Sequence, residues 1–259
     1  MNKTQSAITP LAPTLQEFGH WLRSQTPGHG SVRATVLHHT WSPTAAQYAG
    51  RQTIVNIRNY HMRTLGWSDI GANAYACPDG TVVTGRPLSA SNWSHALVSR
   101  SRPEAEARAV SGGDKLWFNH FAFGLETVAN FDSEPLDRGP SGVSYETALR
   151  VLTVVHTVYK LPASRLFFHR DVADKSCPGR QLDRAKVRAE LDRRLRGAIM
   201  ADVDGWAAAY VERAIEEGLM TRGEDGKFRG NDPTTRQETA VVLVRLLDKM
   251  RQELRLDHN

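Results

Sequence analysis

Cysteine and long apolar runs are both scarce in this chain of 259 residues. The only cysteines are Cys77 and Cys177, too few for the disulfide framework of a small secreted scaffold. No stretch approaches the roughly 20 consecutive apolar residues that cross a bilayer, so we expect no membrane partner. The first residues lack the compact apolar block and the small-residue cleavage site of a secretory signal, so we expect synthesis in the cytoplasm.

Positive charge exceeds negative charge by five over the whole chain, and the excess lies in its first part. Acidic residues outnumber basic ones by three between 201 and 259, which leaves a net charge of +8 on the preceding residues. A basic part suits an anionic polymer such as a cell wall; nucleic acid or ordinary solubilising charge would explain it as well. The sequence has none of the motifs typical of nucleic-acid binders, so we expect no nucleic-acid partner.

Strand-like and helix-like segments alternate along the first 200 residues. Strands are predicted at 32–39, 121–129 and 165–168, and a hairpin at 72–84 around Pro78-Asp79-Gly80. Helices are predicted at 15–22, 52–65, 145–159 and 181–196. This alternation predicts an α/β domain with helices packed on a central sheet. Near residue 200 the pattern changes to two helices, 206–217 and 236–254, so we expect two domains, 1–199 and 200–259, the second a small all-α module.

The segment from His169 to Cys177 carries the strongest chemical signal. It reads HRDVADKSC, is followed by Pro-Gly, and begins where a predicted strand ends. Imidazole and thiolate are both zinc ligands, and a loop of this length can bring them together. The third ligand could be His38 or His39, at the end of another predicted strand. Three ligands leave one zinc position open for a water molecule, which zinc activates near neutral pH.

Further motifs stand in a fixed order around these residues. They are His38-His39-Thr40, Gly66-Trp67-Ser68-Asp69-Ile70-Gly71, Asp79-Gly80-Thr81, Gly85-Arg86-Pro87 and the loop 169–177. Over residues 33–182 this series resembles the zinc N-acetylmuramoyl-L-alanine amidases of the phage-endolysin and peptidoglycan-recognition-protein superfamily. The resemblance implies a central mixed β-sheet flanked by helices and a bound Zn²⁺. It also implies cleavage of peptidoglycan between N-acetylmuramic acid and the L-alanine of the stem peptide. His38, rather than His39, is the implied ligand beside His169 and Cys177.

The resemblance also implies two catalytic residues. Lys175, two positions before the last ligand, matches a family lysine whose charge can stabilise an oxyanion. Many relatives carry a tyrosine directly after Asp-Ile-Gly, but that position is Ala72 here. Other members use the glutamate of a Gly-Ile-Glu pattern, which Gly124-Leu125-Glu126 matches. Apolar neighbours would raise the pKa of Glu126 and suit it to exchange protons with water and the leaving amine; an outward-facing carboxylate is the alternative.

Three other side chains are candidates for contact with the substrate. His39 is expected to line the cleft or to form a hydrogen bond beside it. Trp67 could offer its face to a sugar ring, although tryptophan more commonly packs in a core. His95 could border the cleft, whereas His61 is expected to face the sheet.

The C-terminal part resembles one S-layer homology module. The matching residues are Asp202-Val203, Trp206-Ala207, Ala214-Ile215, Gly218-Leu219-Met220, Phe228, Asn231-Asp232-Pro233 and Thr235-Arg236-Gln237-Glu238. Such modules bind secondary polysaccharides of Gram-positive walls, and Arg236 at a helix start would meet an anionic sugar. A capping interaction between Thr235 and Glu238 explains the same residues structurally. The family usually combines three modules, so a single module suggests that this chain forms a homo-oligomer.

We therefore expect a phage or prophage endolysin that reaches the wall after holin-dependent or lysis-dependent release. One alternative is a cytosolic amidase that trims recycled wall fragments, against which the C-terminal module argues. The other is a recognition protein that binds peptidoglycan without cutting it, against which Cys177 argues because it completes a ligand set.

Overall fold

The computed structural model of the protein describes residues 15–95, 105–200, 203, 207–221, 223 and 227–256. Its residues form two compact units, Met1–Asp192 and Arg193–Asn259. Helix α7 (Arg184–Met200) runs continuously across this division. A boundary after residue 199, at the end of that helix, stays a prediction.

A five-stranded sheet forms the centre of the first unit. Its strands are β1 (Ala34–His39), β2 (Ala74–Ala76), β3 (Val82–Thr84), β4 (Ala122–Thr127) and β5 (Leu166–Phe168). The order across the sheet is β3-β2-β4-β1-β5. All neighbouring pairs are parallel except β2 and β3, which form the predicted antiparallel hairpin. The expected fold class, an α/β domain with a mixed sheet, is confirmed.

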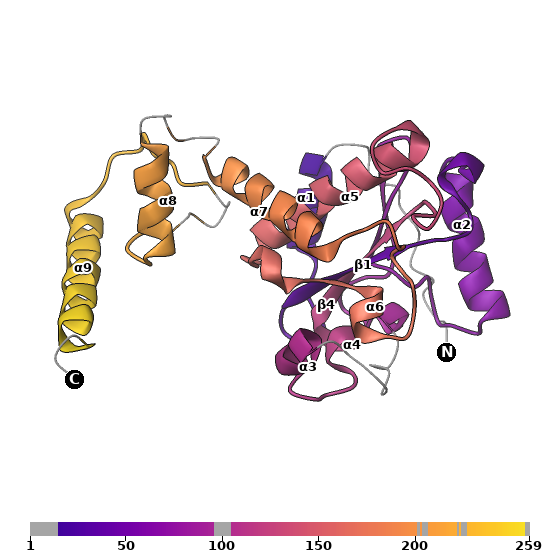
Figure 1. The fold of residues 1–259 in the computed structure, drawn as a ribbon, viewed down its shortest axis with the longest axis horizontal. Coiled ribbons are helices and arrows are strands. Elements are labelled where there is room, and N and C mark those ends of the chain that lie inside the picture. The colour runs from indigo at the N-terminus through magenta and orange to yellow at the C-terminus, as the bar shows by residue number, and fades with distance from the viewer. Residues whose placement is uncertain are drawn as a thin grey trace. The chain divides into compact units, whose positions relative to one another are not determined.

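Helices cover both faces of this sheet (Figure 1). They are α1 (Leu15–Ser24), α2 (Arg51–Asn59), α3 (Ala105–Ser111), α4 (Trp117–Phe121), α5 (Gly139–Val158), α6 (His169–Val172) and α7. Helices α3, α4 and α6 lie on one side of β1 and β4, and α1 and α5 lie on the other. Short 3₁₀ turns lie at Ala45–Gln47, Trp93–His95 and Ala163–Arg165.

The central strands are almost entirely buried because both of their faces are covered. All six residues of β1 are buried, as expected for a parallel strand between two helical layers. On the α3, α4 and α6 side, Val36 of β1 packs in a cluster with Phe118 and Phe167. The rings of Phe118 and Phe167 meet edge to face, with centroids 5.1 Å apart, an arrangement that aromatic pairs favour. This cluster packs helix α4 and strand β5 against β1.

The predicted helix 52–65 differs from the observed structure at its C-terminal end. After α2 the chain forms a π-helical turn, Tyr60–Thr64, in which Leu65 N–H donates to Tyr60 O at 3.1 Å. Gly66 then stops the helix at φ +71°, a conformation that glycine adopts without strain. The wider turn redirects His61, which receives the N–H of Gly71 at Nδ1, 3.1 Å away. Apolar spacing predicts the helix but does not distinguish this change of pitch.

The second unit contains the two predicted helices, observed as α8 (Ala208–Glu216) and α9 (Arg236–Leu256); the expected start at Trp206 lies outside the described residues. Arg245 of α9 donates to Leu219 O at 3.3 Å, and Lys249 forms an ion pair with Glu217. Thr235 and Glu238 form a reciprocal cap, with Thr235 N–H donating to Glu238 at 2.8 Å and Glu238 N–H donating to Thr235 Oγ1 at 3.2 Å. Among the described residues, no helix combines the length and apolar character needed to cross a bilayer.

Candidate functional site

Strand register places the chemically active side chains in one row at the carboxyl edge of the sheet. His38 of β1 lies directly beside Glu126 of β4. On the other side, Leu37 pairs with Phe168 of β5, so His169, the next residue, follows at the level of His38. The carboxyl edge of parallel strands is where α/β proteins commonly place their ligands.

His38, His169 and Cys177 converge at this edge. Their candidate ligand atoms all lie within 4.8 Å of one another. Cys177 Sγ is 3.7 Å from His38 Nδ1, and the rings of His38 and His169 have centroids 4.4 Å apart. His169 Nε2 is buried without a hydrogen-bond partner in the described part of the chain. A buried nitrogen without a partner is costly, and two imidazoles with a thiolate form an established zinc-ligand set. The residues therefore fit a zinc ion.

Burial keeps both imidazoles of the cluster neutral. Desolvation, followed by the nearby His169, lowers the pKa of His38 well below its usual value. Desolvation, followed by the charge of Lys175, lowers the pKa of His169 to about 4. Burial raises the pKa of the Cys177 thiol. A neutral imidazole is the form that binds a metal, whereas the thiol must lose its proton when a cation enters.

His39 lies next to the cluster and makes a different set of contacts. Its Nδ1 accepts the N–H of Phe131 at 3.1 Å, and the two rings stack. Its own backbone N–H points at Cys177 Sγ, 3.4 Å away. The geometry therefore places His38, rather than His39, among the candidate ligands, and it makes the His39 backbone a hydrogen-bond donor to the cysteine sulfur.

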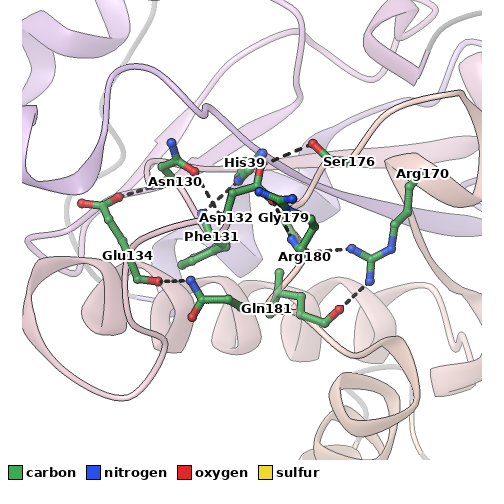
Figure 2. Close-up of polar contacts among 11 residues, drawn as sticks. His39, Asn130, Phe131, Asp132, Glu134, Arg170, Ser176, Gly179, Arg180 and Gln181 are labelled. Carbon is green, nitrogen blue, oxygen red and sulfur yellow. Dashed lines mark hydrogen bonds and ion pairs between the residues drawn. The ribbon is translucent and has the colours of Figure 1, made fainter.

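Figure 2 shows how the loop that carries Cys177 is fastened to the segment after β4. Asp132 accepts hydrogen bonds from Ser176 Oγ at 3.3 Å and from Arg180 N–H at 2.8 Å. These two partners flank Cys177 in the sequence. A Cβ on Gly179 would lie 2.6 Å from Phe131, so only glycine lets the two segments approach this closely.

Arg170 fastens the same loop from its other side. Its guanidinium donates to Gly179 O at 2.7 Å and to Leu182 O, as Figure 2 shows. Its backbone N–H donates to Cys177 O at 2.8 Å. The sequence gives no signal for these contacts, because Arg170 donates to backbone carbonyl oxygens, and which carbonyls it reaches depends on the path of the loop in three dimensions.

The row of side chains opens into a cavity of about 480 Å³. Seven of the residues that line it were expected at the site: His38, His39, Trp67, Glu126, His169, Lys175 and Cys177. Four more line it in the structure: Trp41, His61, Ser94 and Ser176. His61 was expected to face the sheet, and the π-helical turn is the physical reason for the difference. In the sequence, only the position of His61 in the helix before Gly66-Trp67 indicates that it could reach the site.

Glu126 faces this cavity from a strand that is otherwise buried. Burial raises its pKa from 4.5 to about 8, so the carboxyl group is protonated at neutral pH unless a cation stabilises its charge. The alternative of an outward-facing carboxylate is wrong. A tyrosine, Tyr75 of β2, lies in register with Glu126. It does not line the cavity, because its side chain is fully buried and its hydroxyl accepts the N–H of Ala72 at 3.3 Å.

The remaining expected residues lie in three different settings. Lys175 is exposed at the cavity rim, and Trp67 lies against His61 with ring centroids 4.6 Å apart. His95 was expected at the cleft border, but it is fully buried behind His38 and does not line the cavity. Its place behind the ligand, rather than beside the substrate, corrects that expectation. Arg236 is exposed at the first residue of α9.

Comparison with known proteins gives two family matches. Residues 28–180, more than half of the chain, match the N-acetylmuramoyl-L-alanine amidase family, and residues 200–240 match the S-layer homology domain. Peptidoglycan-recognition protein SC1a of Drosophila melanogaster is 26% identical over 168 residues, covering 63% of this chain and 77% of that protein. Outer membrane protein SlpA of Deinococcus radiodurans is 41% identical over 46 residues, 18% of this chain and 4% of that protein.

Similar solved structures include an endolysin N-acetylmuramoyl-L-alanine amidase, LysCS, from Clostridium intestinale. It is 22% identical, covers 73% of this chain and 93% of its own, and has a TM-score of 0.44. Drosophila PGRP-LB is 21% identical, covers 61% of this chain and 80% of its own, and has a TM-score of 0.42. On the family match, the chain belongs to the N-acetylmuramoyl-L-alanine amidase family, whose members hydrolyse or recognise peptidoglycan, and it carries an S-layer homology domain.

Proposed function

We propose that the protein is a zinc-dependent hydrolase of peptidoglycan that cleaves the amide bond between N-acetylmuramic acid and L-alanine. One observation carries this proposal: a complete ligand set, His38, His169 and Cys177, lies beside the buried carboxyl group of Glu126 in a single cavity. A protein that only recognises peptidoglycan has no need of a third ligand or of a carboxyl group with a raised pKa. The arrangement therefore favours hydrolysis over recognition alone.

The chain's own residues divide the work of the reaction. His38, His169 and Cys177 would hold the zinc, which supplies a Lewis acid and activates water for attack on an amide carbonyl. Glu126 accepts the proton of the attacking water and passes it to the departing amine of L-alanine. A carboxyl group with a pKa near neutral pH can do both, and burial gives Glu126 that property.

Lys175 is placed to stabilise the negative charge that develops on the carbonyl oxygen. It lines the same cavity, and its charge contributes to the lowered pKa of His169. A cation that acts mainly on the developing charge lowers the barrier without tightening substrate binding. His39 and Trp67 also line the cavity, where they can contact the muramyl peptide.

The S-layer homology domain extends this proposal to the wall as a whole. We assign to it, within a domain spanning 200–259, the binding of a secondary cell-wall polysaccharide, with Arg236 as an anion contact. A lytic enzyme with such a domain suits an endolysin that acts on the wall after release by lysis. The domain also argues against a cytosolic enzyme that recycles soluble wall fragments.

Helix α9 further supports self-association of the chain. Seven of its apolar side chains are between 39% and 58% exposed: Val241, Leu243, Val244, Leu246, Leu247, Met250 and Leu254. Leu243, Leu247, Met250 and Leu254 follow the four-and-three spacing that forms the seam of a coiled coil. A second copy of the same helix would cover this stripe, and we propose a homo-oligomer formed through α9.

Metal content tests the catalytic proposal. The wild-type protein should bind about one zinc per chain, lose peptidoglycan cleavage when a chelator removes it, and regain cleavage when zinc is added back. Cys177→Ala should lose both metal and activity. Cys77→Ala is the matched control, because Cys77 is buried in an apolar cluster away from the site and its loss should leave the metal content unchanged. Full activity of metal-free protein would refute the proposal.

A further inference from the structure

Behind the ligand cluster, His38 contacts a second histidine that the reaction itself does not use. His38 Nδ1 faces Cys177 Sγ, and its other nitrogen, Nε2, is 3.0 Å from Nδ1 of His95. The two rings stack with centroids 5.2 Å apart and an interplanar angle of 24°. His95 is fully buried and belongs to the 3₁₀ turn Trp93–His95. Both nitrogens of the His38 ring are therefore engaged, one toward the ligand cluster and one toward His95.

The direction of these hydrogen bonds follows from the group at the end of the chain. His95 Nε2 is 3.4 Å from Ala122 O, and a carbonyl oxygen can only accept. His95 therefore carries its proton on Nε2 and accepts at Nδ1. His38 must then carry its own proton on Nε2, which leaves the lone pair of Nδ1 free for the ligand cluster. Each ring then carries a single proton, on Nε2, so the assignment needs no charged imidazole.

The backbone leaves a specific space for His95. A Cβ on Gly124 would lie 2.8 Å from His95 Cε1 and 2.4 Å from Asn92 Nδ2. Asn92 in turn donates to Asn73 Oδ1 at 2.8 Å and accepts the N–H of Ser94 at 3.1 Å. The segment that carries His95 is thus fastened to the sheet directly over Gly124, two residues before Glu126.

We propose that His95 is a positioning residue of the metal site: it holds His38 in the orientation and tautomer that bind zinc through Nδ1. This inference rests on the zinc site proposed above. A ligating histidine commonly donates its second N–H to a neighbouring group, and loss of that partner typically weakens metal binding about 10-fold to 100-fold. His95 supplies the acceptor through a neutral ring, in a position where other zinc sites use a carboxylate or a backbone carbonyl.

Two variants separate the hydrogen bond from mere filling of space. His95→Leu fills most of the volume but cannot accept the proton of His38, whereas His95→Gln retains an acceptor oxygen. Zinc affinity, measured by competition with a chelator of known affinity, should fall at least 10-fold in His95→Leu and recover most of that loss in His95→Gln. The absorption spectrum of the cobalt-substituted protein should change in the same order, because it reports ligand geometry.

His156→Leu is the matched control. His156 is also buried and bonded to β1, through Thr35 Oγ1 at 2.9 Å, but it lies on the opposite face of the sheet from His38. Its loss should lower stability and leave zinc affinity unchanged.

A measurement on the wild-type protein guards against a variant that fails to fold. Nitrogen NMR of the zinc-loaded protein should show His38 protonated at Nε2, bound to metal at Nδ1, and coupled across the hydrogen bond to His95 Nδ1.

The outcomes distinguish this inference from the function on which it rests. A wild-type protein that binds no zinc would overturn the proposed function. A wild-type protein that binds zinc, with His38 bound through Nε2 or with His95→Leu as tight as wild type, would overturn the role of His95 alone. A Gln variant as weak as the Leu variant would also overturn it, because the acceptor would then be irrelevant.

Discussion

Replacement of Glu126 by glutamine tests the raised pKa of this carboxyl group separately from its proposed role as the base. Glutamine keeps the shape of the side chain but does not ionise between pH 4.5 and pH 9. Burial raises the pKa of Glu126 from 4.5 to about 8 in the protein without metal. In the unfolded chain the carboxyl group ionises near pH 4.5. Between these two values the folded wild type holds a proton that the unfolded chain has released, so its stability falls as the pH rises.

The size of this effect follows from the shift. A displacement from 4.5 to about 8 corresponds to at most about 5 kcal/mol of unfolding free energy, at about 1.4 kcal/mol per pH unit. Glu126 is partly covered and faces an open cavity, so water offsets part of the cost. We expect Glu126→Gln to match wild type near pH 4.5 and to be more stable by about 2–4 kcal/mol at pH 9.

Denaturant unfolding of both proteins in excess chelator, at pH 4.5 and pH 9, measures this difference. Effects of the neighbouring histidines largely cancel because both proteins contain them. The same variant, loaded with zinc, should bind the metal normally and hydrolyse peptidoglycan about 100-fold more slowly or worse. A stability difference that does not change with pH would refute the raised pKa, and near-normal turnover would remove Glu126 from the reaction.

Four further variants test the surrounding residues and the second domain. Lys175→Ala should keep its zinc and lower kcat at least 10-fold with little change in KM; a change in KM alone would assign Lys175 to substrate binding. Gly179→Ala should weaken zinc binding and lower stability, because a Cβ would strike Phe131 at a residue whose φ is +113°; unchanged zinc affinity would show that the fastening of the loop does not position Cys177. A chain ended after Met200, which retains all of α7, should cleave soluble fragments like the full chain, bind intact walls less well and run as a monomer in light scattering, whereas the full chain runs larger. Arg236→Ala should weaken wall binding alone, and equal wall binding by all three proteins would refute the targeting role of the second domain.

Local patterns predict much of the fold, because buried strands such as β1 are rich in β-branched and apolar residues and end at clear turn signals. The convergence of the ligand cluster could also be anticipated, since a short loop joins His169 to Cys177 and the family resemblance assigns His38 to the same ligand set. The order of the strands in the sheet could not be predicted, because the periodicity of one strand carries no information on its neighbours. The π-helical turn at His61 depends on one additional residue within a single hydrogen-bonded ring, which the spacing of apolar residues does not resolve.

The place of His95 shows a different limit of sequence reasoning. Its role depends on the absent side chain of Gly124 and on a carbonyl oxygen of Ala122, and both are features of the backbone in three dimensions. A histidine near aromatic residues suggests a cleft when it is considered alone. The structure instead buries it behind a ligand, and only the hydrogen-bond geometry distinguishes the two positions.

Digestion of purified peptidoglycan tests the central claim most directly. Zinc-loaded protein should release new amino groups without new reducing sugars, and the freed peptides should have the mass of complete stem peptides that begin with L-alanine. The metal-free protein, Cys177→Ala and Glu126→Gln serve as controls, each with little or no release. Reducing sugars among the products, peptides cut within the stem, or binding of peptidoglycan by the zinc-loaded protein without any release would contradict the assignment as an amidase.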